Sequence, residues 1–388
     1  MSLAGSRPII AIPGPSPVPD RVLRAMHRVS PDIYGDHLAA VNAGLIDGLR
    51  WLAGTAGTVV PYIGNGHAGW EAASANLLSP GDAVLVLVSG RFGEGWAELL
   101  RMQGMAVEVM DFGATAPDPA RVAERLAADT ARAIRAVCVC QIDTASSVQA
   151  DIAGLRAAMG DHPALFVVDA IASLGCAPMR MDDWGVDVLI AASQKGLMCP
   201  PGCSFLWLSD RAASMPATVL TTPWWDMRPR MNAQALWQFW GGTPPVQHIF
   251  GLTEAIAIMR EEGLEAVWAR HRALAEMVAA AFGCWSAGGD MALNVADPAA
   301  RAASVTAARL AGADGLRGWL AEKAGLTLGI GLGAADPANA LRVAHMGDAG
   351  AVQMLGVLGA MQAGMAARGI AHGPGALDAA AGVVARRA

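Results

Sequence analysis

The feature that most constrains the fold is a regular alternation of short apolar runs with helical patterns between residues 83 and 192. Five runs rich in Val, Leu, Ile and Ala are predicted to be strands buried on both faces, at 83–89, 106–112, 136–142, 164–170 and 186–192. The segments between them, such as 94–104, 119–133 and 151–162, have the spacing and turn-like ends of helices. Repeated strand–helix–strand units predict an α/β fold with a mostly parallel sheet that helices cover on both sides.

Length and composition indicate a large globular chain with much interior. A chain of 388 residues exceeds the size at which one core keeps growing, so we expect a large domain with a smaller companion. Apolar residues make up 54% and charged residues 16%, which favours a buried interface and an oligomer. The net charge of −6 comes without any block of Lys or Arg, so neither nucleic acid nor a membrane surface is an expected partner.

The six cysteines show neither the spacing of a zinc site nor the density of a disulfide framework. We therefore expect no metal site and a reducing, cytoplasmic environment. No charged start leads into a long apolar segment, so neither export nor membrane anchoring is expected.

Three regions are predicted along the chain. Residues 1–20 form an N-terminal segment whose proline-rich part, 12–19, should be irregular, and residues 21–255 form the large domain. A long amphipathic helix over 253–283 leads into a small C-terminal domain, residues 256–388. There, 326–333 and 340–347 are candidate strands and 349–369 is a candidate helix.

Two charged residues lie at the carboxyl ends of predicted buried strands, where ligands of parallel sheets gather. Lys195 comes just after the run 186–192. A lysine becomes a nucleophile through desolvation or a Schiff base with an aldehyde cofactor, whereas the ordinary alternative is a surface lysine. Asp169 ends the run 164–170, where a buried carboxylate needs a partner. That partner is a helix N-terminus, a salt bridge, or the ring cation of pyridoxal phosphate.

Two further stretches suggest anion binding. Residues 64–73, "GNGHAGWEAA", follow an apolar run and open a helix, so their backbone N–H groups can approach a phosphate, although a simple turn explains such glycines equally well. The stretch matches neither the nucleoside-triphosphate loop nor the dinucleotide fingerprint. Arg342, inside a short apolar strand, is either a bidentate clamp for a substrate carboxylate or part of an internal ion pair.

Together with "SQKGLMCPPG" and "VDAIASLG", these stretches make the chain resemble a known family nearly end to end. It is similar to the class V aminotransferases, which are fold-type I pyridoxal phosphate enzymes, and within them to the glyoxylate aminotransferases. The resemblance implies a seven-stranded sheet in the large domain, pyridoxal 5′-phosphate as cofactor, and a homodimer whose active sites are shared between subunits.

The resemblance also implies a role for each matching residue. Lys195 forms the covalent link to the cofactor and Asp169 pairs with its ring nitrogen. The other implied site residues are Asn65, Gly66, His67 and Gln194 at the phosphate, Phe92 over the ring, Thr144 at the ring oxygen, Trp240 and Thr243 reaching the phosphate of the other subunit, and Arg342 and Gly14 at the substrate. The loop "DTASSV", 143–148, lacks the glycine that is common in this family.

The implied reaction moves an amino group from an L-amino acid, serine or aspartate, to glyoxylate by a ping-pong mechanism. Aspartate would need a second cation to bind its side-chain carboxylate, whereas serine would need none. Arg228 and Arg230 are candidates for this cation, and the alternative is that they are solvated loop charges. Pyridoxamine–pyruvate transamination is the main alternative, for which we expect an acidic residue in place of Asn65. A lyase or desulfurase is a second alternative, and it would need a catalytic cysteine on a mobile loop. A non-catalytic binding protein of the same fold is a third, against which the retention of Lys195 and Asp169 argues.

Overall fold

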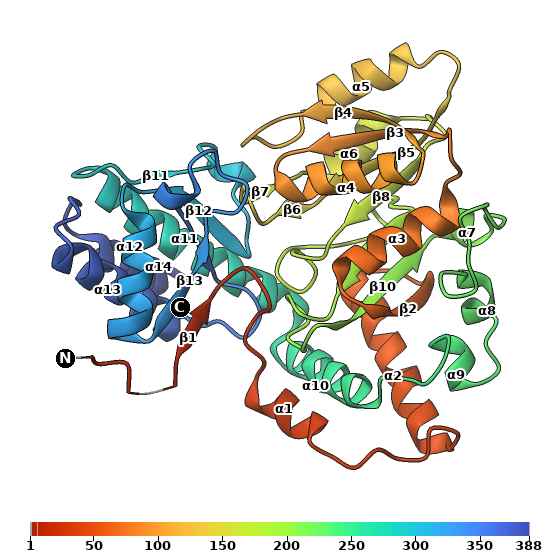
Figure 1. Ribbon diagram of the computed structural model, residues 1–388, viewed down its shortest axis with the longest axis horizontal. Helices are drawn as coiled ribbons and strands as arrows, with labels where there is room; N and C mark the ends of the chain where they lie inside the picture. The colour runs from red at the N-terminus through yellow and green to blue at the C-terminus, as the bar shows by residue number, and fades with distance from the viewer. Residues whose placement is uncertain (1, 6, 388) are drawn as a thin grey trace.

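A seven-stranded sheet lies at the centre of the larger part of the molecule in the computed structural model, which describes residues 2–5 and 7–387 (Figure 1). The strand order is β2-β10-β9-β8-β5-β3-β4. The strands are β2 (Thr58–Gly64), β3 (Ala83–Val88), β4 (Ala106–Asp111), β5 (Ile134–Cys140), β8 (Leu165–Asp169), β9 (Val188–Ala192) and β10 (Gly202–Leu208). Only β10 runs antiparallel to its neighbours, β2 and β9. The predicted seven-stranded, mostly parallel sheet is confirmed.

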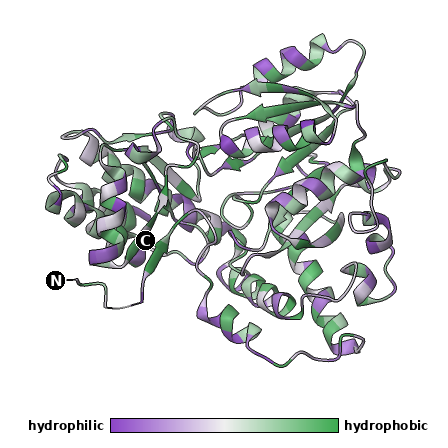
Figure 2. Ribbon diagram, in the orientation of Figure 1, coloured by the Kyte–Doolittle hydropathy of each residue, from purple (hydrophilic) through white to green (hydrophobic). Residues whose placement is uncertain are grey.

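Helices cover both faces of this sheet, because the central strands are apolar on both sides (Figure 2). In β8, Phe166 and Val168 pack into one core cluster, whereas Leu165 and Val167 pack into the other. The first cluster includes α2 (Asp36–Ala53), α5 (Pro119–Ala128), α6 (Ile152–Met159) and α10 (Val246–Glu262). The second includes α3 (Gly66–Leu77) and α4 (Arg91–Met102). The face that α3 covers is therefore the face on which the odd-numbered residues of β8 lie.

The edges of the sheet depart from the sequence prediction. β4 is an edge strand without a fully buried residue, so the prediction that it is buried on both faces is wrong for this strand. β2 and β10 have no counterpart among the predicted strands. β2 contains Pro61 and forms the opposite edge, where a residue without an N–H group is tolerated. A short hairpin, β6 (Ile142–Asp143) with β7 (Val148–Gln149), follows β5.

A second, five-stranded sheet forms the smaller part of the molecule (Figure 1). Its order is β1 (Ile9–Ala11), β13 (Leu326–Ile330), β14 (Ala340–Ala344), β12 (Val305–Arg309) and β11 (Ala292–Leu293). The helices of this part are α11 (Leu264–Ser286), α12 (Ala313–Trp319), α13 (Ala351–Ala367) and α14 (Ala376–Arg387), with two short 3₁₀ helices, η1 (Pro298–Ala300) and η3 (Pro337–Asn339), and a π-helical segment, η2 (Leu320–Ala324). The predicted strands near 326 and 340 and the predicted helix near 351 are confirmed. Because β1 pairs in parallel with β13, the N-terminal segment belongs to the small sheet.

The predicted single helix over 253–283 is wrong, because the chain breaks it at Gly263. This residue has φ +87° and ψ 134°, a conformation that is accessible to glycine, and it separates α10 from α11. The predicted domain boundary after residue 255 falls inside α10, which packs on α1 (Asp20–Met26) and α2. We propose that the two parts of the chain meet at Gly263.

The remaining segments are irregular or short. The proline-rich stretch 12–19 has no helix or strand, as predicted. Three short helices, α7 (Asp210–Ala213), α8 (Met227–Met231) and α9 (Leu236–Phe239), lie between β10 and α10. Among the residues that the structure describes, no helix is long and apolar enough to cross a membrane, and no group of three His, Cys, Asp or Glu is placed to hold a metal ion.

Candidate active site

A cavity lies where β5, β8 and β9 end at their carboxyl edge. It contains about 610 Å³ of space, including its mouth, which is open to solvent. Its wall consists of Asn65, Gly66, His67, Trp70, Phe92, Ile142, Thr144, Asp169, Ile171, Ala172, Gln194 and Lys195. The structure therefore brings the two predicted charged residues, Lys195 and Asp169, into one cavity together with the predicted glycine-rich turn.

Asp169, the last residue of β8, is 5% exposed and is held by neutral donors. The backbone N–H of Ile171 donates to its Oδ1 at 2.7 Å, and the indole Nε1 of Trp70 donates to its Oδ2 at 2.9 Å. Burial raises the pKa of Asp169 to about 6, although these hydrogen bonds act in the opposite direction. The carboxylate is thus placed to accept a cationic partner from the cavity.

Lys195 follows β9 and meets the irregular N-terminal segment. Its Nζ donates a hydrogen bond to the carbonyl oxygen of Pro13. The next residue, Gly14, has φ +108°, and a Cβ atom there would lie 2.6 Å from Cε of Lys195, so only glycine fits this close approach. Ser16 fixes the same segment, because its Oγ donates to the carbonyl oxygen of Lys195 at 2.7 Å. The sequence did not predict the contribution of Pro13 or Ser16.

The environment of Lys195 favours the neutral amine. Burial lowers its pKa from 10.5 to about 8, and the positive charge of Arg342 adds to this effect, while Asp169 opposes it. In the unfolded chain the amine regains its ordinary pKa, so between these two values the unfolded state binds more protons than the folded state. The contribution of Lys195 to stability must therefore become more favourable as the pH rises through this range.

We predict this pH dependence for the ligand-free protein. Lys195→Met removes the buried charge, so the variant should be more stable relative to wild type at pH 7.5 than at pH 10, by on the order of 2 kcal/mol. Urea unfolding at the two pH values measures the difference. Lys323→Met, at the only other lysine of the chain, serves as the control and should show no such change. A wild-type-to-Lys195→Met difference that is independent of pH would contradict the assignment.

The turn at the start of α3 has the features of an anion site. The Asn65 side chain caps the helix by accepting from the backbone N–H of His67 at 3.1 Å, and the helix N-terminus faces the cavity. A Cβ atom on Gly66 would lie 2.5 Å from Cδ1 of Ile171, so the Ile171 side chain, which lines the cavity, would have to shift to admit one. Beside the turn, the side-chain oxygen of Gln194 is buried without a hydrogen-bond partner. This oxygen can therefore accept a hydrogen bond from a donor group of a ligand.

Asp143 organises the wall that carries Phe92 and Thr144. It is 1% exposed, and its Oδ2 accepts from the backbone N–H groups of Phe92 at 2.8 Å and of Gly93 at 3.1 Å. Its carboxylate thereby caps α4 and sets where the Phe92 ring enters the cavity. In the same loop Ser147 has φ +62°, in the left-handed region that favours glycine, and its Oγ accepts from the backbone N–H of Ala307.

Arg342 comes from the small sheet and contacts the cavity wall, although it is not itself one of the lining residues. It lies on β14 and is 7% exposed. Its Nε donates to the carbonyl oxygen of Ile330 at 2.7 Å, and its Nη1 donates to that of Thr144, in the cavity wall, at 2.9 Å. Burial lowers its pKa to about 10. These backbone contacts fix the plane of the guanidinium at the junction of the two parts of the molecule, which suits a carboxylate-binding role.

Trp240 and Thr243 do not line the cavity. Trp240 is fully buried in the core beside Phe205, and its indole Nε1 donates to Asn42 Oδ1 at 2.9 Å. In this arrangement the indole N–H is not available to a second subunit. Thr243, in contrast, is exposed.

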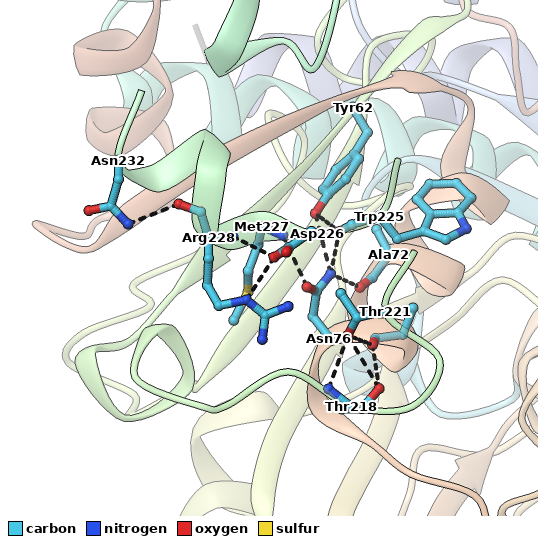
Figure 3. Close-up of polar contacts among 11 residues, drawn as sticks. Tyr62, Ala72, Asn76, Thr218, Thr221, Trp225, Asp226, Met227, Arg228 and Asn232 are labelled. Atoms are coloured by element: carbon cyan, nitrogen blue, oxygen red, sulfur yellow. Dashed lines mark hydrogen bonds and ion pairs between the residues drawn. The ribbon is translucent and has the colours of Figure 1, made fainter. Parts of the chain in front are cut away.

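Arg228 and Arg230 also lie outside the cavity wall. Figure 3 shows Arg228 next to Asp226, whose Oδ1 accepts from Nε at 2.7 Å, within the network around Asn76. Arg230 is 2% exposed, lies 4.4 Å from the centre of the Tyr62 ring, and donates to the carbonyl oxygens of Pro61 and Trp224. The interpretation of Arg230 as a solvated charge is therefore wrong.

The donor set of the cavity fits pyridoxal 5′-phosphate. Lys195 offers an amine for the aldehyde, and Asp169 offers an anion for the protonated ring. The backbone N–H groups at the capped start of α3 suit the phosphate. When bound, this cofactor supplies an electron sink for reactions at the α-carbon of an amino acid.

Comparisons with known proteins agree with this fit. Residues 51–347 match the family model described as aminotransferase class-V. The chain is 31% identical to a serine–glyoxylate aminotransferase of Methylorubrum extorquens, covering 95% of this chain and 94% of the relative. It is 35% identical to an L-aspartate–glyoxylate aminotransferase of Paracoccus denitrificans, covering 71% of each chain. The solved structure of a pyridoxamine–pyruvate aminotransferase from Mesorhizobium loti is 27% identical, with a TM-score of 0.90 and coverage of 100% of both chains.

The family match spans most of the chain, and it includes both Asp169 and Lys195. Class V aminotransferases depend on pyridoxal phosphate, and the cavity has the groups that this cofactor requires. The chain therefore belongs to the class V aminotransferases and is a pyridoxal phosphate-dependent transaminase.

Proposed function

We propose that this enzyme transfers the amino group of an L-amino acid, with serine preferred over aspartate, to glyoxylate. The observation that carries the choice of donor is the charge of the cavity. Its described wall contains Lys195 and Asp169, and Arg342 contacts this wall at Thr144, whereas Arg228 and Arg230 lie elsewhere. One arginine suffices for the α-carboxylate of serine, while the second carboxylate of aspartate would need another cation. Serine–glyoxylate and aspartate–glyoxylate aminotransferases among the relatives support glyoxylate as acceptor.

Each charged residue has a task in this reaction. Arg342 binds and orients the donor's α-carboxylate, because its guanidinium plane is fixed by two backbone carbonyls. Lys195 would remove the α-proton of the donor, a task for which a pKa near 8 is close to the operating pH. Asp169 would hold the cofactor by its ring nitrogen, because a buried anion there would stabilise the protonated ring.

We further propose a homodimer in which each subunit completes the phosphate site of the other. Thr243 is the better candidate for this contact, because it is exposed, whereas Trp240 is buried and its N–H is already bonded to Asn42. A cytoplasmic location completes the proposal, and it rests on the buried or half-buried cysteines, all of which are free.

Pyridoxamine–pyruvate transamination is the alternative that one comparison favours, because the solved enzyme from Mesorhizobium loti covers the whole chain. The neutral Asn65 at the helix start supports a phosphorylated cofactor instead. An acidic side chain there would repel a phosphate and would suit the free alcohol of an unphosphorylated ligand.

A panel of donors and acceptors tests the proposed function. L-Serine, L-aspartate and L-alanine are added singly to the protein loaded with pyridoxal phosphate, and conversion to the pyridoxamine form is followed by absorbance. We expect serine to react fastest and glyoxylate to restore the starting spectrum. If free pyridoxamine and pyruvate turn over while serine and aspartate leave the spectrum unchanged, the proposed function is wrong.

Arg342→Lys should weaken donor binding more than it slows the chemistry. Lysine offers a single ammonium charge in place of a planar guanidinium with several N–H donors. It cannot keep both backbone contacts of Arg342. We expect KM for the amino donor to rise about 10- to 100-fold with a smaller change in kcat. Arg309→Lys, at an exposed position of the neighbouring strand β12, is the matched control. An unchanged KM in Arg342→Lys would show that another residue binds the carboxylate.

A further inference from the structure

Trp70 is a cavity residue that the sequence did not single out. It lies on α3, one turn after the glycine-rich start of this helix, and is 2% exposed. Its indole Nε1 donates to Asp169 Oδ2 at 2.9 Å. On the other side its ring stacks against Trp96, with the ring centres 5.6 Å apart and the planes 7° from parallel. A donor inside a stacked pair has little freedom to move.

The fold explains why this indole reaches the acid. α3 lies close to the sheet, since a Cβ atom on Gly69 would be 2.7 Å from Cγ2 of Ile190 in β9. Asp169 is an odd-numbered residue of β8 and so faces α3. Cys140 is its register partner at the end of β5 and faces the same way, with Sγ 3.5 Å from Asp169 Oδ2.

The two oxygens of Asp169 therefore have different surroundings. Oδ1 accepts a backbone N–H, which any residue except proline would supply at position 171. Oδ2 depends on two side chains, the strong indole donor of Trp70 and the weak thiol donor of Cys140. Hydrogen bonds to the charged form are what offset the burial of this carboxylate, and they also fix its plane.

We propose that Trp70 is a positioning residue that keeps Asp169 anionic and oriented toward the ring nitrogen of the cofactor. The proposal rests on the role of Asp169 in the proposed function. Trp70 acts through the carboxylate of Asp169 and not on the substrate. Its loss should therefore reduce the rate of proton transfer without weakening the binding of the amino donor by Arg342.

Trp70→Phe tests the proposal, because it keeps an aromatic ring and removes the donor. Trp96→Phe is the matched control, since it changes the other member of the same stack and removes no hydrogen bond to Asp169. The first readout is the infrared titration of the buried carboxyl in the cofactor-free protein, identified as the signal lost in Asp169→Asn. We expect Trp70→Phe to raise the midpoint of this titration by about one pH unit or more, and Trp96→Phe to leave the midpoint unchanged.

Two readouts on the loaded enzyme complete the test. Trp70→Phe should weaken cofactor binding about tenfold or more and lower kcat, while KM for the amino donor stays near the wild-type value. Trp96→Phe should change neither quantity by more than about twofold. Equal carboxyl titrations in the two variants would overturn the proposal.

Cys140 provides a second variant if Trp70→Phe does not fold. Cys140→Ala removes the weaker donor and should shift the titration in the same direction by a smaller amount, whereas Cys140→Ser keeps a donor and should not raise it. An unshifted or lowered titration in Cys140→Ala would then contradict the role of the Oδ2 donors. Because the infrared titration needs no cofactor, it decides the role of Trp70 even if no amino donor reacts with the wild-type enzyme and the proposed function fails.

Discussion

Lys195→Ala should lower kcat by at least about 10³-fold and remove the visible absorbance of bound cofactor. The substitution deletes two functions at once, the covalent link to the aldehyde and the base that moves the α-proton. The chain has two lysines, and Lys323 lies in η2, where it pairs with Glu322 away from the cavity. No second lysine can therefore replace the lost amine. Steady-state rates and absorbance spectra at equal cofactor loading measure the effect.

Lys323→Ala is the control for this prediction and should keep wild-type rates and the wild-type spectrum. The account would be contradicted if Lys195→Ala retained the visible band together with more than a few per cent of the activity. Loss of the visible band in Lys323→Ala, with the band kept in Lys195→Ala, would show that the cofactor is linked to Lys323 and would also contradict the account.

Asp169→Asn should have the second largest effect, a decrease in kcat/KM of about 10²- to 10³-fold. Asn has nearly the same shape, but it carries no charge, so the ring nitrogen loses the anion that keeps it protonated. Removing a buried charge relieves desolvation, while Asn leaves one donor unpaired. These effects oppose each other, and we expect the free energy of unfolding of the cofactor-free protein to change by less than about 2 kcal/mol.

Kinetics and urea unfolding, measured on the same preparation of Asp169→Asn, separate function from folding. A variant that is folded and inactive agrees with the account. A variant that is folded and as active as wild type shows that Asp169 is a structural acid. Asp169→Glu keeps the charge on a longer side chain and should recover part of the lost activity.

The predicted part of the site lies at the ends of strands. Parallel strands bring their carboxyl ends to one edge, so a polar residue that ends an apolar run is informative even without coordinates. This is why Asp169 and Lys195 could be singled out from residues 164–170 and 186–195, and the structure places both in one cavity. The glycine-rich turn before α3 was recognisable for a similar reason, because its glycines precede a helix.

The residues that the sequence did not single out depend on contacts between distant segments. Trp70 belongs to a helix where an aromatic residue normally indicates core packing, and its distance of 99 positions from Asp169 hides their hydrogen bond. Pro13 contributes a backbone carbonyl, which has no signature in a sequence. Asp143 caps α4 from a hairpin 50 residues further along the chain.

The places where the structure differs from the prediction have causes in individual residue contacts and backbone conformations. Gly263 divides a continuous amphipathic pattern because its backbone adopts a conformation that the pattern does not encode. Arg230 is charged and follows a proline, which is typical of an exposed loop, but two backbone carbonyls and the Tyr62 ring hold it in the interior. Trp240 occupies a core site bonded to Asn42, a contact between residues 198 positions apart.

Locating the covalent link between protein and cofactor tests the central claim most directly. The protein is incubated with pyridoxal phosphate, the link is reduced with borohydride, and the modified peptide is identified by mass spectrometry after proteolysis. The account predicts one cofactor per chain on Lys195, and no stable label on Lys195→Ala. A label on Lys323 or on the terminal amine, or none on a folded wild-type protein, would contradict it.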